Sequence, residues 1–225
     1  GAMRLVAALV VPIAAMLFVL GSDVSVLLFG YGAATTNQAA VMGDVVSIFM
    51  IGLLPFTLFY VLLRGFYAME DTRTPFVVTV IFSVIMLALV LWLFTFLTDL
   101  GVTSAGGPQI AGIALGYALA YWCGFVVLWW WLARRLGSLQ SGATAWVLLR
   151  LLIAGGIAVF MAGLTRTATL DLLISDGLNT QLTSLVLIMA AVIVGVPAFF
   201  LVAWLLRVRE VSAAVAMVKS RVVRR

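Results

Sequence analysis

The stretch from residue 62 to residue 75, LLRGFYAMEDTRTP, concentrates the side chains best suited to binding chemistry. Within it, Arg64 and Arg73 enclose two acids, Glu70 and Asp71. Guanidinium groups bind phosphates through two parallel hydrogen bonds, so the arginines could contact an anionic headgroup or form part of a gate. The alternative is an ordered connection, in which the two acids pair with the two arginines and fix the flanking segments.

The flanking residues predict that this stretch joins two helices. A cation at the position of Arg64 offsets the negative end of a helix dipole. Thr74 is expected to cap the next helix, with Pro75 at its first position, where a missing N–H costs nothing.

The composition determines which kind of protein carries these helices. Hydrophobic residues make up 65% of the 225 residues and charged residues only 9%, and the mean hydropathy is +1.27. Such a chain lacks the polar residues needed to cover a soluble domain. It is expected to be an integral membrane protein.

Six apolar runs are each long enough to cross a bilayer core of about 30 Å as a helix. They cover roughly residues 5–29, 43–63, 76–98, 110–133, 145–165 and 183–206. Barrel strands would be about 10 residues long and would alternate polar with apolar residues. The predicted fold is therefore all-α, with a six-helix transmembrane bundle over residues 1–206 and consecutive helices as antiparallel neighbours.

The distribution of charge predicts the orientation of the bundle. Twelve of the 13 basic residues fall on one side of the predicted membrane, and only Arg166 falls on the other. That other side carries five of the eight acids, namely Asp23, Asp44, Asp99, Asp171 and Asp176. Basic loops remain in the cytoplasm, so both termini are predicted to be cytoplasmic. The net charge of +5 follows from this asymmetry and does not favour a nucleic-acid partner.

Several classes of chemistry lack the residues they need. The chain has no histidine and one cysteine, Cys123, so it offers no ligand set for zinc or an iron–sulfur cluster. It has no glycine pattern that binds nucleotides, and no nucleophile–base or paired-carboxylate arrangement is visible. No cofactor and no metal are expected, and an enzyme is the least favoured class.

Small residues and prolines predict how the helices pack. Small residues recur every four positions in two of the runs, which is typical of helix–helix contact faces in membranes. They are Gly112, Gly116, Ala120 and Gly124 in the fourth run, and Ala154, Ala158 and Ala162 in the fifth. Pro12, Pro55 and Pro197 each remove a backbone donor and should kink a helix. Pro55 is the strongest candidate for a break near a transport cavity, with a static kink as the alternative.

Ionisable residues are almost absent from the predicted membrane spans, and Asp44, at the outer mouth of the second helix, is the nearest. Charge inside a membrane usually marks an ion or substrate path. The sequence therefore predicts that this chain, taken alone, lacks a polar transport site.

A longer pattern around the opening stretch, G-x-x-P-F…L-x-R-x-F-Y-A-x-x-D-T-R-T-P, resembles the MurJ/MviN family of lipid II flippases. The matching residues are Gly52, Pro55, Phe56, Leu62, Arg64, Phe66, Tyr67, Ala68, Asp71, Thr72, Arg73, Thr74 and Pro75. The match is specific over residues 5–76 and only positional after that.

The resemblance implies that the six helices correspond to the last six of fourteen. It also implies translocation of an undecaprenyl-pyrophosphate-linked peptidoglycan precursor across the bacterial inner membrane by alternating access. Cell-wall synthesis proteins or cytoplasmic regulators are conceivable partners, beside the lipid-linked precursor and membrane lipids. The candidate substrate-binding or gating residues are Pro55, Arg64, Tyr67, Asp71 and Arg73.

One departure from the family and two alternatives remain. Some relatives bind sodium through Asn and Asp in the helix matching residues 76–98, which has neither residue here. The chain could instead be a membrane scaffold that recruits partners, or an exporter of another polyprenyl-linked saccharide or a drug.

Residues 207–225 form a basic amphipathic pattern, which is expected to lie on the inner leaflet or to begin a linker.

Overall fold

The computed structural model describes residues 2–31, 35–100, 108–136, 141–173 and 179–208. These residues form six helices and confirm the predicted all-α class. The helices are α1 (Ala2–Phe29), α2 (Thr36–Tyr67), α3 (Arg73–Asp99), α4 (Pro108–Leu136), α5 (Ser141–Leu173) and α6 (Thr180–Leu205). Each is long and apolar enough to cross a membrane. Most extend several residues beyond the apolar runs, because their ends carry polar residues.

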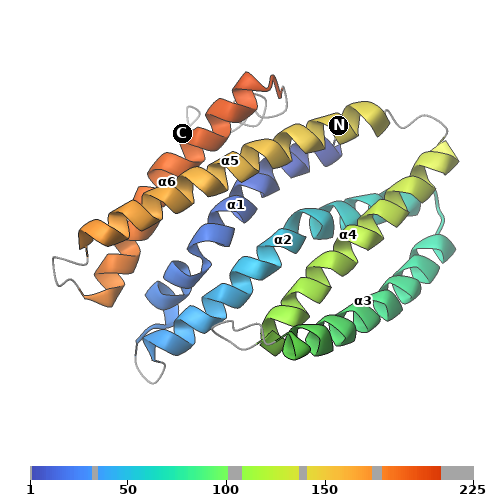
Figure 1. The fold of residues 1–225 in the computed structure, drawn as a ribbon. Coiled ribbons are helices and arrows are strands. Elements are labelled where there is room, and N and C mark those ends of the chain that lie inside the picture. Colours follow the sequence, from blue (N-terminus) through green and yellow to red (C-terminus); the bar gives the residue numbers. More distant parts are fainter. Residues whose placement is uncertain (1, 32–34, 101–107, 137–140, 174–178, 209–225) are drawn as a thin grey trace.

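The helices form a bundle in which α1 and α2 are the central elements and pack against the most neighbours (Figure 1). Helix α1 packs against α2, α5 and α6, whereas α4 packs against α2 and α3. The prediction that consecutive helices are neighbours is therefore only partly right. Helices α2 and α3 touch only slightly, and α4 and α5 make almost no contact. A short connection in the sequence therefore does not ensure that two helices pack together along their lengths.

Close backbone approach explains the main helix pairs. A Cβ atom added at Gly43 of α2 would lie 2.3 Å from the Cα of Ser22 in α1, and one added at Gly116 of α4 would lie 2.8 Å from the Cα of Val90 in α3. Lipid tails are as apolar as leucine, so such close packing holds membrane helices together. The stripe at residues 112–124 is thus confirmed as a contact face. Ala154, Ala158 and Ala162 are fully buried as well.

Aromatic rings attach α3 to the bundle near its middle. The Phe82 ring of α3 lies 5.0 Å from the Phe59 ring of α2 and 4.7 Å from the Tyr121 ring of α4, measured between centroids. Gly124 provides the space, because an added Cβ there would lie 2.8 Å from Phe82. Rings at these separations contribute about 0.5–1.5 kcal/mol per pair beyond the area they bury.

The two ends of the bundle differ in charge. At one end, which we term the basic end, Arg135 of α4 pairs with Asp71, and Arg4 of α1 donates to Thr144 of α5. At the opposite end, Asp23 of α1 pairs with Arg166 of α5. The charge asymmetry read from the sequence therefore exists in three dimensions. Which end faces the cytoplasm stays a prediction.

Candidate functional site

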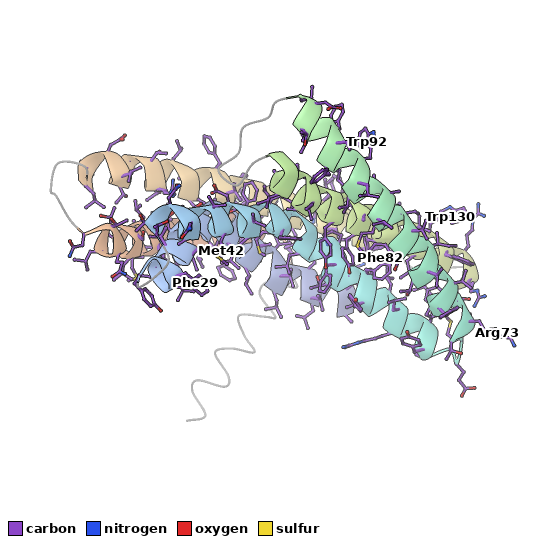
Figure 2. All side chains as sticks on the ribbon, turned by 90° about the horizontal axis from the view of Figure 1, so that it is seen from below. Phe29, Met42, Arg73, Phe82, Trp92 and Trp130 are labelled. Atoms are coloured by element: carbon purple, nitrogen blue, oxygen red, sulfur yellow. The ribbon has the colours of Figure 1, made fainter. Side chains whose placement is uncertain are left out.

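The opening stretch forms the end of α2, a tight turn and the start of α3. Arg64 lies in the last turn of α2, as predicted, and Ala68 follows as its C-cap. Glu70 has a φ of 59°, a left-handed conformation that reverses the chain. Helix α3 then begins at Arg73. Figure 2 shows Arg73 and Phe29, the last residue of α1, at opposite ends of the bundle.

Asp71 organises this turn. One carboxylate oxygen accepts from the Thr74 backbone N–H at 3.0 Å, and the other accepts from the Thr74 hydroxyl at 2.6 Å. The same carboxylate forms an ion pair with Arg135 of α4. The prediction that Thr74 caps α3 is wrong. The helix begins two residues earlier than the proline suggested, and its N-cap position is Thr72, whose side chain makes no capping hydrogen bond. Asp71, just before the N-cap, accepts the Thr74 N–H of the first helical turn instead.

The prediction that the turn pairs with itself is wrong as well. Asp71 forms its ion pair with Arg135 of α4, which is 64 residues away in sequence. In the described part of the chain, Arg64 and Arg73 are exposed and have no ion-pair partner. Arg134, by contrast, lies over the Trp130 ring at 3.7 Å from its centroid. The two arginines of the turn therefore present guanidinium groups that could bind an anion.

The pKa of Asp71 is lowered from 3.8 to about 2, chiefly by the hydrogen bonds from Thr74 and to a smaller extent by Arg135, against the opposing effect of desolvation. Asp71 is thus ionised throughout the physiological range. The stability that it contributes is fully present above pH 4 and is lost as the pH falls toward 2. Asp71 therefore keeps its negative charge in the turn.

Pro55 occupies a different position, buried inside the bundle. As a proline, it cannot donate to the carbonyl of Ile51, four residues earlier. The Trp122 indole N–H of α4 donates to that carbonyl at 3.2 Å. Thr57 adds a second local adjustment, because its hydroxyl donates to the Leu53 and Leu54 carbonyls at 3.0 and 2.8 Å. The break in α2 is therefore satisfied by a side chain from a neighbouring helix.

The structure thus divides the five predicted site residues into two groups. Arg64, Tyr67, Asp71 and Arg73 gather at the basic end, with Tyr67 about half exposed. Pro55 lies nine residues before Arg64, about 13 Å along the helix. It belongs to the wall of the bundle and takes no part in the turn.

An apolar groove of about 250 Å³ runs beside Pro55, between α1, α2, α4 and α5. Trp122 lines it from α4 and Leu152 lines it from α5. Helices α4 and α5 do not pack together, so the groove occupies the space between them. The hydrogen bond from Trp122 to Ile51 therefore stabilises one wall of this groove.

The buried ion pair of Asp23 and Arg166 was missed by sequence reasoning. The sequence placed both residues on the outer side and gave neither a role. In the structure, α5 continues to Leu173, so Arg166 lies about 10 Å inside the helix end. Asp23 is 6% exposed. The expectation that the spans hold almost no ionisable residue is corrected accordingly. A signal was present, since Asp23 lies within the first apolar run and Arg166 directly follows the fifth.

The architecture defines the class first: a multi-pass all-α membrane protein with a cation-bearing turn at one end. The chain belongs to the MurJ family of lipid II flippases, because the family described as "Lipid II flippase MurJ" matches residues 1–175. These flippases are transporters of the inner membrane and are not enzymes. The membrane location agrees with the six apolar helices.

Individual relatives agree with this assignment. A probable lipid II flippase MurJ of Rhizobium tropici is 33% identical over 181 residues, which cover 74% of this chain and 32% of that protein. One of Buchnera aphidicola subsp. Baizongia pistaciae is 33% identical over 128 residues, 57% of this chain and 23% of that protein. The chain therefore spans less than a third of the length of these relatives.

A solved structure shows the same fold. "Lipid II flippase MurJ, inward closed conformation" superposes with a TM-score of 0.60 at 16% sequence identity. The superposition covers 90% of this chain and 37% of that one. The family match extends well beyond the 5–76 region in which the motif is specific. Residues 209–225, most of the predicted tail, lie outside the described residues.

The role of Trp122 can be tested with a double-mutant cycle. Trp122→Phe should lower the free energy of unfolding by about 1 kcal/mol, the usual scale for an interhelical hydrogen bond in a membrane. In a Pro55→Ala background, the new backbone N–H of residue 55 can donate to the Ile51 carbonyl. The part of the destabilisation by Trp122→Phe that comes from the lost hydrogen bond should then disappear. Chemical unfolding of the purified protein in detergent measures both. Equal costs in the two backgrounds would contradict the assignment.

The electrostatics of the turn predict an order of pKa changes. Asp71 should titrate near pH 2, and Thr74→Val should raise its pKa toward 3.8. Arg135→Gln should raise the pKa less, because the hydrogen bonds to Thr74 are the larger cause. Carbon NMR of the labelled carboxyl group measures all three. A larger rise in Arg135→Gln than in Thr74→Val would show that the ion pair, and not the cap, controls Asp71.

Proposed function

We propose that this chain is part of a lipid II flippase that translocates an undecaprenyl-pyrophosphate-linked peptidoglycan precursor across the bacterial inner membrane by alternating access. The observation that carries the proposal is the family match over residues 1–175. The chain corresponds in this proposal to the last six of fourteen helices. The remainder of the relatives' length supplies the other cavity residues.

The turn between α2 and α3 supports a contact with the cargo. Arg64 and Arg73 are exposed at the basic end and unpaired among the described residues, while Asp71 is occupied by Thr74 and Arg135. A pyrophosphate presents several anionic oxygens that arginine forks bind well. In this proposal Arg64 and Arg73 contact the pyrophosphate or gate its entry, Tyr67 borders them, and Asp71 fixes the turn.

Family membership favours a transporter over a scaffold that recruits partners through residues 207–225. An exporter of another polyprenyl-linked saccharide would share the anionic linkage and would need the same arginines. Cell-wall synthesis proteins or cytoplasmic regulators are proposed as partners of the complete protein, with the turn and the tail as the accessible cytoplasmic segments.

The proposal predicts loss of function from the turn arginines. In the full-length protein, Arg64→Ala or Arg73→Ala should impair complementation of flippase loss. Each charged hydrogen bond contributes about 1.5–3 kcal/mol, so the affinity for cargo should fall roughly tenfold or more. Growth after depletion of the resident flippase, at equal protein levels, measures the effect.

Glu70→Gln is the matched control. It changes a charge in the same turn without removing a cation, so growth should be retained. Full growth with both alanine substitutions combined would reduce the turn to a structural connection and remove the proposed cargo contact.

A further inference from the structure

The α5–α6 hairpin is joined to the rest of the bundle chiefly through α1. Helices α5 and α6 pack against each other and against α1, and α5 makes almost no contact with α4 (Figure 1). In lipid, apolar surface alone does not hold helices together, so the specific contacts on α1 decide where the hairpin lies. Those contacts are polar at both ends of the α1–α5 interface.

At the opposite end of the bundle, Asp23 and Arg166 form a two-point ion pair. The Arg166 Nε donates to one Asp23 oxygen at 2.5 Å, and Nη2 donates to the other at 3.1 Å. The Asp23 side chain is 8% exposed and that of Arg166 29%. A charge buried to this extent needs its partner, because removing the partner leaves the charge uncompensated.

At the basic end, Arg4 of α1 meets Thr144 of α5. Its Nε and Nη2 donate to the Thr144 hydroxyl at 3.2 and 3.1 Å. Between the two polar contacts the interface is lined by small and apolar residues. The groove opens there, with Val11 of α1 and Gly155 of α5 both in its lining.

We propose that Asp23 and Arg166 are positioning residues, which hold the α5–α6 hairpin on α1 and thereby fix the width of the groove between α1, α2, α4 and α5. Arg4 and Thr144 hold the other end of the same interface. Asp23 and Arg166 lie about 7 to 10 Å beyond the groove along α1 and α5, so they act through the placement of α5. This inference rests on the proposed function only for its consequence in transport. The positioning itself is independent of the cargo.

Asp44 supplies a matched control for the ion pair. Its carboxylate acts electrostatically on Arg166, but its hydrogen bond is to Ser22. The contact therefore joins α2 to α1 and does not involve the hairpin. Asp44→Asn removes an acid from the same end of the bundle without touching the α1–α5 contact.

Disulfide cross-linking in the full-length protein tests the proposal, in a Cys123→Ser background. The reporter pair is Val11→Cys with Gly155→Cys, since a Cβ at Gly155 lies 2.7 Å from a Val11 methyl carbon. The control pair, Ala162→Cys with Gly195→Cys, lies within the hairpin, where the corresponding Cβ separation is 3.0 Å. Each pair is combined with Asp23→Asn, with Arg166→Gln, with Asp44→Asn, and with the exchange of Asp23→Arg and Arg166→Asp.

The single variants Asp23→Asn and Arg166→Gln should lower the rate of reporter cross-linking at least about tenfold, because loss of one partner leaves a buried charge or dipole unsatisfied. The exchanged pair should restore the rate, and Asp44→Asn should leave it unchanged. The control pair should cross-link at its original rate in every single variant. Unchanged reporter cross-linking in both single variants would overturn the proposal. So would a loss, of one pair or both, that the exchange does not restore.

Complementation by the same variants, without the cysteine pairs, separates the positioning role from the proposed function. Poor growth of the single variants with recovery in the exchanged pair supports a role in transport. Normal growth of variants that have lost reporter cross-linking overturns that role. Failure of the flippase assignment itself would instead show as no complementation by the unmodified full-length protein, with the cross-linking pattern unaffected.

Discussion

The bilayer interior offers no hydrogen-bond partners, and the structure depends on this constraint. Every polar group that the helices carry into the membrane must be satisfied by another part of the bundle. The Ile51 carbonyl, which Pro55 leaves without its usual donor, receives the indole N–H of Trp122 at 3.2 Å. Asp23 and Arg166 satisfy each other in the same way. These polar contacts add to the close backbone packing at the glycines and help to fix which helices are adjacent.

Helix α1 has a central position because of these contacts. It is in backbone contact with α2 at Gly21 and Gly43, and polar contacts at both ends join it to α5. The groove follows from this arrangement, since α4 and α5 are each attached to α1 or α2 and not to each other. The wall formed by α5 is attached to α1 and makes almost no contact with α2 and α4.

The sequence predicted what depends on local properties. The lengths of the apolar runs predicted the six helices. The four-residue spacing of small residues predicted the contact faces of α4 and α5, and the position of Arg64 predicted the end of α2. It failed where partners are distant in sequence. Asp71 and Arg135 are 64 residues apart, and Asp23 and Arg166 are 143 residues apart. Composition placed these charges at helix ends, but only the packing of helices that are not consecutive decides which of them meet.

Charged residues are arranged differently at the two ends of the bundle. At the opposite end, the pair of Asp23 and Arg166 is buried and joins two helices. At the basic end, Asp71 is bound by Thr74 and Arg135, while Arg64 and Arg73 remain exposed. A contact between these arginines and a pyrophosphate entering from the cytoplasm requires that the basic end faces the cytoplasm.

The sidedness of the turn is therefore the most direct measurement. Two single-cysteine variants of a full-length protein otherwise free of cysteine, Glu70→Cys and Tyr31→Cys, would be treated with a membrane-impermeant maleimide on intact spheroplasts. Glu70 lies in the turn, and Tyr31 is exposed at the opposite end of the bundle. Labelling of Tyr31→Cys in intact spheroplasts, with Glu70→Cys labelled only after the membrane is opened, is the predicted result. Labelling of Glu70→Cys in intact spheroplasts would place the arginines outside and contradict a cytoplasmic contact with the cargo.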